Sequence, residues 1–138
     1  MRRLVVDTSA LCALVDKGEQ RHQHVVSFLQ EHETELILFV SDYILDETLT
    51  WIKARFGSKS AIEFGRRIRA SQFCRYYVLS AEDEAATWTI FEKYANKHWS
   101  YTDCSSLAMM QRLNITEALS LDAHFRQMGV QIWPQSSG

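Results

Sequence analysis

The sequence predicts an α/β fold in which a parallel sheet is flanked by helices. Five short apolar runs of strand length alternate with segments of helical periodicity, a pattern typical of parallel sheets. The chain has 138 residues, enough for one domain with a substantial core. Hydrophobic residues make up 46% of it and charged residues 23%, which excludes disorder over most of its length. We expect one domain over residues 1–134 and a disordered tail over residues 135–138.

The first elements are predicted from their apolar patterns. A β-branched run over 3–6 forms a strand, and a helix over 9–15 follows it. The next helix has an apolar side made of three residues, Val25, Phe28 and Leu29. The unbroken apolar run over 36–40 is typical of a strand that is covered on both faces.

The middle of the chain is predicted to hold two helices and a strand. One helix covers 42–56, and another starts at about Ser60, where Ser60 and Glu63 have the spacing of a capping box. The strand covers 76–79.

The last third begins with a long helix from Ser80. Its apolar residues Trp88, Phe91 and Ala95 recur at i, i+3 and i+7. The remaining predicted elements are a helix over 102–113, a strand over 118–121, a short helix from Asp122 and a strand over 130–132.

Three acidic residues are predicted to lie near one edge of the sheet. Asp7 follows the first strand and Asp122 the fourth, and the carboxyl ends of parallel strands share one edge. Asp103 lies in the first turn of its helix and shares an inward face with Leu107 and Met110. Taken singly, an acid at a helix start is explained by the helix dipole, which favours it by about 0.3–1 kcal/mol.

Glu47 is harder to explain by structure alone. At about 100° per residue it stands beside Trp51 at the border of the apolar arc, while Asp46 faces solvent near Lys53. A carboxylate beside a core is costly to desolvate unless a cation meets it. Several carboxylates without a matching set of histidines or thiolates favour Mg²⁺ or Mn²⁺, which often serve phosphoryl chemistry.

Charge is unevenly distributed along the chain. The net charge of −2 argues against a simple cationic nucleic-acid-binding protein. Between residues 53 and 75, however, there are seven basic residues and a single acid, Glu63. The basic residues are Lys53, Arg55, Lys59, Arg66, Arg67, Arg69 and Arg75. This segment could attract a polyanion, and a solvated face of two helices explains it equally well.

Four short motifs resemble those of the PIN-domain nucleases, and most closely the VapC-type toxins of toxin–antitoxin pairs. They are Val-Asp-Thr-Ser-Ala-Leu over 6–11, Asp-Glu-Thr-Leu over 46–49, Ser-Tyr-Thr-Asp-Cys over 100–104 and Leu-Asp-Ala-His-Phe over 121–125. Each motif is weak singly, but their order and spacing form a strong joint signal. The resemblance extends over residues 4–132, nearly the whole chain.

The resemblance implies a PIN-like three-layer sandwich whose five-stranded parallel sheet is flanked by helices. It also implies carboxylate-bound Mg²⁺ or Mn²⁺ and RNA hydrolysis that leaves 5′-phosphate and 3′-hydroxyl ends. The matching catalytic and metal-binding residues are Asp7, Glu47, Asp103 and Asp122, with Thr8, Ser9 and Thr102 as secondary polar contacts. The implied chemistry needs no histidine base.

The implied partners are an RNA substrate, a cognate antitoxin protein and a second copy of the chain. The basic residues Lys53, Arg55, Arg66, Arg67 and Arg69 are candidates for contacts with the RNA backbone. Trp99 and Tyr101 are available for base stacking, but core or interface roles are expected for them rather than stacking.

Other functions stay open at this point. The chain could be a free-standing ribonuclease in RNA processing or a catalytically silent PIN-like interaction domain. An aspartyl-phosphate mechanism of the haloacid-dehalogenase kind would need a second Asp at position 9, where Ser9 stands. His22 and His24 form a His-x-His pair without a third ligand, so a surface position is expected for them rather than a zinc site.

The compartment is expected to be the cytoplasm. The three cysteines form no C-x-x-C pair, so neither a disulfide framework nor a thiolate metal site is indicated. No apolar run approaches the roughly 18 residues that span a bilayer, and the first residues lack the apolar stretch of a signal peptide.

Overall fold

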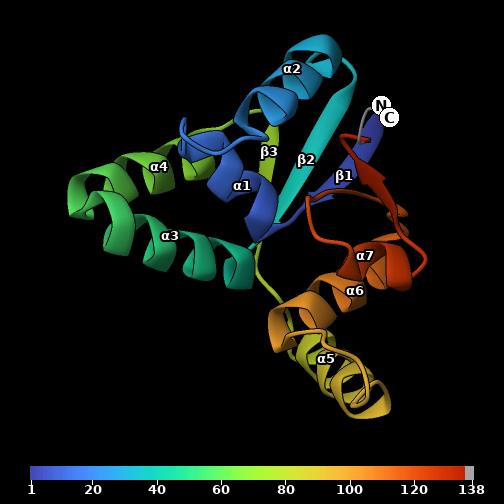
Figure 1. Cartoon of the computed structure of the whole chain (residues 1–138). Coiled ribbons are helices and arrows are strands. Elements are labelled where there is room, and N and C mark those ends of the chain that lie inside the picture. The colour runs from blue at the N-terminus through green and yellow to red at the C-terminus, as the bar shows by residue number, and fades with distance from the viewer. Residues whose placement is uncertain (136–138) are drawn as a thin grey trace.

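A five-stranded parallel sheet forms the centre of the protein, as the sequence predicted. The computed structural model describes residues 1–135 (Figure 1). The strands are β1 (Arg2–Val6), β2 (Leu36–Ser41), β3 (Cys74–Tyr77), β4 (Glu117–Leu119) and β5 (Gln131–Trp133). They are hydrogen-bonded in the order β3-β2-β1-β4-β5, and all neighbours are parallel.

Helices cover both faces of the sheet and produce the predicted three layers. Alternation along β1 divides the core, because Leu4 and Val6 point to one face and Val5 to the other. The first face is covered by α1 (Thr8–Val15), α2 (His22–His32), α3 (Asp42–Phe56) and α4 (Ser58–Ala70). The second is covered by α5 (Ala81–Lys93), α6 (Tyr101–Leu113) and α7 (His124–Gln127). Figure 1 shows α3 and α4 extending away from the sheet as an antiparallel pair.

The topological switch point lies between β1 and β4. The chain leaves β1 toward β2 on one side, and β4 pairs with β1 on the other. Val6 is in register with Leu119, and the backbone N–H of Asp7 donates to the carbonyl of Leu119 at 2.9 Å. The carboxyl ends of these two strands therefore meet where open α/β sheets bind ligands.

Helix α6 is the most deeply buried helix of the described chain. Every residue from Asp103 to Met110 is buried, because the helix lies between the sheet and α5. Asn114 closes the helix in the left-handed conformation with φ 55°. The start of α6 is thereby held firmly near the edge of the sheet.

Strand β3 lies two residues earlier than predicted. Its register with β2 pairs Leu38 with Cys74 and Ser41 with Tyr77, where the ladder ends. Val78 is exposed, and the N–H of Leu79 donates to the Asp42 carboxylate at 3.0 Å instead of to a neighbouring strand. The apolar run 76–79 therefore marks the exit of the chain from the sheet.

The start predicted for α4 is also wrong. Gly57, with φ 97°, lies between α3 and α4, and the helix begins at Ser58 without a side-chain cap. Ser60 and Glu63 are inside the helix and form no capping box. Glycine adopts this backbone conformation easily, and Gly57 turns the chain directly after α3. Helix α4 therefore starts at Ser58, before Ser60.

Helix α5 buries a different face from the one its large apolar residues suggest. It ends at Lys93, before Ala95, and Trp88 and Phe91 are exposed. The buried side consists of Asp83, Thr87 and Ile90. Asp83 is compatible with burial because it accepts hydrogen bonds from Ser80, Tyr77 and Arg112.

The segment after β4 leaves the sheet earlier than predicted. The strand ends at Leu119 and α7 begins at His124, so Asp122 lies in the connection between them. The N–H of His124 donates to the Asp122 carboxylate at 2.9 Å, which is a local turn rather than a helix start at Asp122.

Of the predicted tail 135–138, only Gln135 is among the described residues, and it is exposed. Within the described part of the chain, no helix combines the length and apolar character needed to cross a membrane.

Candidate metal centre

Asp7 is buried at the carboxyl end of β1, where it caps the N-terminus of α1. Its Oδ2 accepts hydrogen bonds from the Ser9 hydroxyl at 2.7 Å and the Ser120 hydroxyl at 3.2 Å. Ser9 Oγ in turn accepts from the N–H of Leu121 at 2.9 Å. These bonds tie the start of α1 to the segment that follows β4.

The environment of Asp7 disfavours its charged form. The pKa of Asp7 is raised from 3.8 to about 6. Burial is the largest cause, the charges of Asp103 and Asp122 act in the same direction, and hydrogen bonds from Ser9 oppose them. The three acids therefore lie close enough to interact, as their predicted places at one edge of the sheet implied.

Asp103 is positioned by the cap of α6. It is buried, as are Leu107 and Met110, with which it was predicted to share an inward face. Its Oδ2 accepts from the N–H of Ser100 at 2.9 Å, and its own N–H donates to Ser100 Oγ at 3.0 Å. This capping box fixes the carboxyl group at the first turn of the helix.

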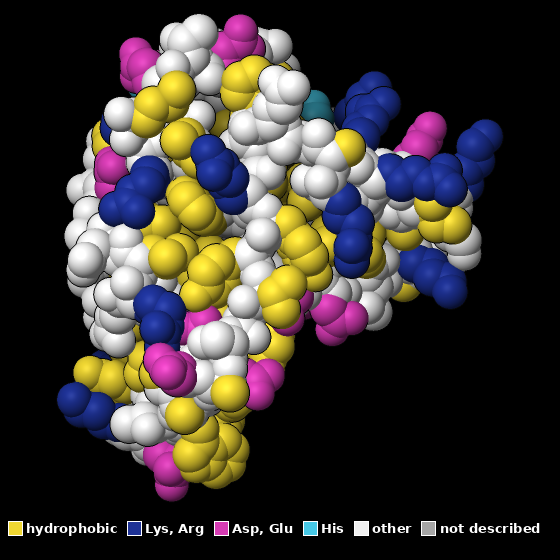
Figure 2. Space-filling view, turned by 180° about the vertical axis from the view of Figure 1, so that it is seen from behind, with side chains coloured by type: hydrophobic (Ala, Val, Ile, Leu, Met, Phe, Trp, Pro, Cys, Tyr) yellow, Lys and Arg dark blue, Asp and Glu magenta, His cyan; other side chains and the backbone are white. Residues whose placement is uncertain are grey.

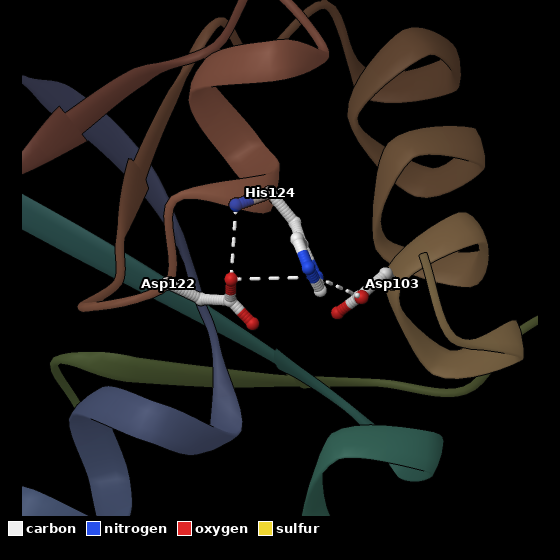
Figure 3. A group of neighbouring side chains, drawn as sticks. All are labelled: Asp103, Asp122 and His124. Carbon is white, nitrogen blue, oxygen red and sulfur yellow. Dashed lines mark hydrogen bonds and ion pairs between the residues drawn. The ribbon is translucent and has the colours of Figure 1, made fainter. Parts of the chain in front are cut away.

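Asp122 is half-buried and lies opposite Asp103, with the imidazole of His124 between them (Figure 3). His124 Nδ1 is 3.1 Å from Asp103 Oδ2 and 3.4 Å from Asp122 Oδ1. Asp103, Asp122 and His124 each offer a ligand atom, and these atoms lie within 4.8 Å of one another.

Each of the three acids uses one oxygen for bonds within the protein. Asp7 and Asp103 use Oδ2, and Asp122 uses Oδ1. Within residues 1–135, Asp7 Oδ1, Asp103 Oδ1 and Asp122 Oδ2 accept no hydrogen bond. One oxygen of each acid is therefore available to an external cation.

The charge of this cluster is not balanced by basic side chains. In the described part of the chain, no lysine or arginine forms an ion pair with Asp7, Asp103 or Asp122. Thr8 Oγ1, beside Asp7, is also buried without a hydrogen-bond partner among residues 1–135. Oxygen donors with unbalanced negative charge fit Mg²⁺ or Mn²⁺.

Glu47 lies on α3 and is exposed, as is Asp46. The desolvation cost expected for Glu47 at the border of the apolar arc does not arise, because its side chain is exposed to water. Glu47 nevertheless lies on the side of α3 that faces α1, because its charge acts on Cys12, which belongs to α1. The pKa of Cys12 is raised to about 12, mainly by burial, and the charges of Asp7, Glu47 and Asp16 contribute.

The secondary polar residues have different surroundings. Ser9 is the residue that holds Asp7 and contacts the segment after β4. Thr102 is half-buried in the first turn of α6, and its carbonyl accepts from Ser105 Oγ at 2.6 Å. Thr8 and Ser9 thus adjoin Asp7, while Thr102 adjoins Asp103.

The predicted RNA-contacting residues form a basic arm, which we define as Lys53, Arg55, Arg66, Arg67 and Arg69 on α3 and α4. All five are exposed, and Figure 2 shows basic side chains gathered on this extension of the molecule. Arg55 forms an ion pair with Asp16 at 3.2 Å, and Arg69 lies over the ring of Tyr76. Among residues 1–135, Lys53, Arg66 and Arg67 form no ion pair.

The two aromatic candidates for base stacking differ in accessibility. Trp99 is buried and its indole N–H donates to Gln127 at 3.0 Å, which makes it a core residue. Tyr101 is half-buried in an aromatic cluster with Tyr43, Trp88 and Phe91.

Two residues of the site were missed by the sequence reasoning, Ser120 and His124. His124 lies within the fourth motif, two residues after Asp122, and this short spacing was the available signal. Ser120 gave no signal, because its contact with Asp7 joins residues that are 113 positions apart. The predicted H-x-H pair is unrelated to the site, since His22 Nδ1 contacts the carbonyl of Ala13 at 2.8 Å.

Known proteins share this architecture. The 23S rRNA-specific endonuclease VapC20 of Mycobacterium tuberculosis is 27% identical over 133 residues, covering 96% of this chain and 99% of the relative. The crystal structure of M. tuberculosis VapC20, a sarcin–ricin loop cleaving toxin, matches with a TM-score of 0.83 over 92% of this chain and 95% of that one. VapBC2 from Rickettsia felis, bound to a promoter DNA fragment, matches with a TM-score of 0.73 and 8% identity over 94% and 96%. At that identity the match shows a shared fold alone.

The sequence model of one family, the PIN domain, matches residues 4–131. This range contains the three acids of the site, Asp7, Asp103 and Asp122, and the two serines whose hydroxyls contact Asp7, Ser9 and Ser120. The chain belongs to the PIN domain family.

Proposed function

We propose that this PIN domain protein is a metal-dependent ribonuclease that hydrolyses phosphodiester bonds of RNA. The observation that carries the proposal is the convergence of Asp7, Asp103 and Asp122 at the switch point without a basic partner among the described residues. The similarity to VapC20, which is named as an rRNA endonuclease, supports RNA as the substrate.

The chemistry follows from the donor set. The free oxygens of the three acids, with Glu47 nearby, would hold Mg²⁺ or Mn²⁺. When bound, such an ion lowers the pKa of a water molecule and offsets charge on the leaving oxygen. The hydroxyls of Ser9 and Ser120 donate to the Asp7 carboxylate, and the backbone N–H of Ser100 donates to the Asp103 carboxylate. These bonds keep the two carboxyl groups oriented before substrate arrives.

We also propose that the protein is the toxin of a toxin–antitoxin pair, acts in the cytoplasm and forms a homodimer. The structures of VapBC2 from R. felis and of FitAcB from Neisseria gonorrhoeae share its fold, with TM-scores of 0.73 and 0.67. An antitoxin segment would then cover the acidic edge and silence the enzyme. Co-expression with the protein encoded next to it, followed by co-purification and an activity assay, tests this partner.

Purified protein incubated with ribosomes and with total RNA tests the ribonuclease proposal. Cleavage is expected with Mg²⁺ or Mn²⁺, is expected to stop with EDTA, and should leave 5′-phosphate ends. Asp7→Asn and Asp103→Asn should each abolish cleavage in a folded protein, whereas Asp46→Asn serves as a charge-matched control. Undiminished cleavage by either site variant would contradict the proposal.

A further inference from the structure

His124 connects two acids that come from different elements. Asp103 belongs to α6, whereas Asp122 precedes α7, and the chain separates them by 19 residues. The His124 ring contacts both carboxyl groups through the same atom, Nδ1, at 3.1 Å and 3.4 Å. Its backbone N–H holds the same Asp122 oxygen at 2.9 Å. In Figure 3 the imidazole stands between the two acids as their direct link.

We infer that His124 is a positioning residue whose Nδ1–H holds Asp103 and Asp122 so that their free oxygens share one divalent cation. This inference rests on the proposed function, since it assigns a role within the same metal centre. In this role His124 is not a metal ligand. Its ring contacts Asp103 Oδ2 and Asp122 Oδ1, the two oxygens that already accept hydrogen bonds from backbone N–H groups.

The division of oxygens supports this role. Asp103 Oδ2 accepts from the Ser100 N–H and contacts the imidazole, which leaves Oδ1 without a hydrogen bond within the described chain. Asp122 Oδ1 is likewise engaged, which leaves Oδ2. Figure 3 shows both free oxygens on the same side, in the space below the imidazole. A donor behind a ligating carboxylate orients it and tunes metal affinity.

The need for such a residue follows from repulsion. Asp7, Asp103 and Asp122 are near enough for their charges to act on one another. Without the ring, the backbone N–H of His124 still holds Asp122, but nothing joins it to Asp103. Asp122 is half-buried and lies between secondary-structure elements. An N–H between them holds the pair together before a cation binds.

Metal titrations of the full chain, without RNA, test the inference. The variants are His124→Ala, His124→Asn and His124→Gln, measured with Mg²⁺ and Mn²⁺ by calorimetry. Asn places an amide N–H at the position of Nδ1, whereas Gln places it one bond further out. The backbone N–H remains in every variant, so the comparison isolates the ring.

We expect His124→Ala to lower the affinity for Mg²⁺ and for Mn²⁺ by a similar factor, in the range of about 10–100-fold. His124→Asn should recover most of the affinity, and His124→Gln should not. His22→Ala is the matched control, because His22 also uses Nδ1 in a close contact but lies apart from the acids. Thermal melts of all variants confirm that the proteins are folded.

Two results would overturn the inference. A loss of affinity confined to Mn²⁺, with Mg²⁺ affinity unchanged, would make His124 a nitrogen ligand, since Mg²⁺ is the ion held by oxygen ligands and water. Unchanged affinity for both ions would leave the ring without a role at the metal. RNA cleavage is a separate measurement, so wild-type protein that binds metal in this pattern but cleaves no RNA would refute the proposed function alone.

Discussion

Asp7 is the carboxyl group for which the fold makes ionisation most costly. Its pKa of about 6 lies above the ordinary 3.8, mainly because the group is buried. A raised carboxyl pKa destabilises the folded state once the group is ionised. In the metal-free protein this penalty is absent below about pH 3.8, grows as the pH rises, and is complete above about pH 6.

We therefore expect Asp7→Asn to stabilise the metal-free protein at pH 8 by up to about 3 kcal/mol, given 1.36 kcal/mol per pKa unit. At pH 4 the difference should largely vanish. Asparagine remains a good N-cap, so the start of α1 is preserved. Urea unfolding in EDTA at both pH values measures the effect.

Asp16→Asn is the control for this experiment, because Asp16 lies at the other end of α1 and pairs with Arg55. It should give no gain at pH 8. Mg²⁺ should stabilise the wild type more than Asp7→Asn, since a ligand adds stability only where it binds. A variant that is less stable than the wild type at pH 8 in EDTA would be inconsistent with an ionisation penalty at Asp7.

The neighbouring residues Asp46 and Glu47 allow a matched comparison on α3. Both are exposed, but the charge of Glu47 acts on Cys12 together with that of Asp7, so Glu47 lies on the side of the site. We expect Glu47→Gln to lose most RNA cleavage and to weaken Mn²⁺ binding. Asp46→Asn should change both by little, because it removes an equal charge from outside the site.

Cleavage rates and Mn²⁺ titrations of the two variants, side by side, decide the matter. Their stabilities should agree within about 0.5 kcal/mol, as is usual for surface substitutions. Equal losses in both variants would point to the total negative charge of α3 rather than to a role of Glu47.

At the level of elements, two helices begin with the same motif but with different consequences. Ser80 with Asp83 caps α5, and Ser100 with Asp103 caps α6. Asp83 binds Arg112 and Tyr77, so its charge is used within the structure. Asp103 faces the acidic cluster instead, so the second capping box also sets the geometry of the site.

Ser80→Ala and Ser100→Ala should each lower the free energy of unfolding by about 1 kcal/mol, the usual value of an N-cap. Only Ser100→Ala is expected to weaken Mn²⁺ binding and RNA cleavage, because it loosens Asp103. Urea unfolding and metal titration of both variants test this difference. If the two substitutions impair metal binding equally, global destabilisation explains the effect and the specific role of the cap is refuted.

At the level of the whole molecule, acidic and basic surfaces are separated. The acids gather at the switch point of the sheet. The basic arm lies on α3 and α4, which extend away from the sheet in Figure 1, and Figure 2 shows basic side chains on this extension. Arg55 and Arg69 already contact Asp16 and Tyr76, which leaves Arg66 and Arg67 as the exposed arginines of the arm without such contacts in the described chain. An RNA that reaches the acids could therefore be held along the arm.

The double variant Arg66→Ala with Arg67→Ala should weaken RNA binding and reduce its salt dependence. Each phosphate contact contributes roughly 0.7 to the slope of log K against log salt for single strands, so a decrease of about 1.4 is expected. Binding titrations at three salt concentrations with catalytically inactive protein measure it. Arg3→Ala is the control, because Arg3 is exposed at the opposite, amino end of β1. An unchanged slope would assign the arm to solvent or to a protein partner.

The sequence by itself determined the succession of strands and helices along the chain and the edge of the sheet at which the acids meet. Apolar runs such as 36–40 are local signals, and parallel strands must share their carboxyl edge. Asp7, Asp103 and Asp122 were therefore predictable as neighbours. The boundaries of β3 and α4 were not, because a ladder register and the backbone of Gly57 set them.

Only the tertiary structure decided which side chains complete the site. Ser120 reaches Asp7 across 113 positions, and His124 joins Asp122 to an acid on another helix. It also decided burial: Glu47 is solvated, Trp88 is exposed, and Asp83 is buried because Arg112 and Tyr77 satisfy it. The physical reason is that periodicity reports the preference of a residue for one face, whereas hydrogen-bond partners far along the chain determine whether a polar group is buried and what it binds.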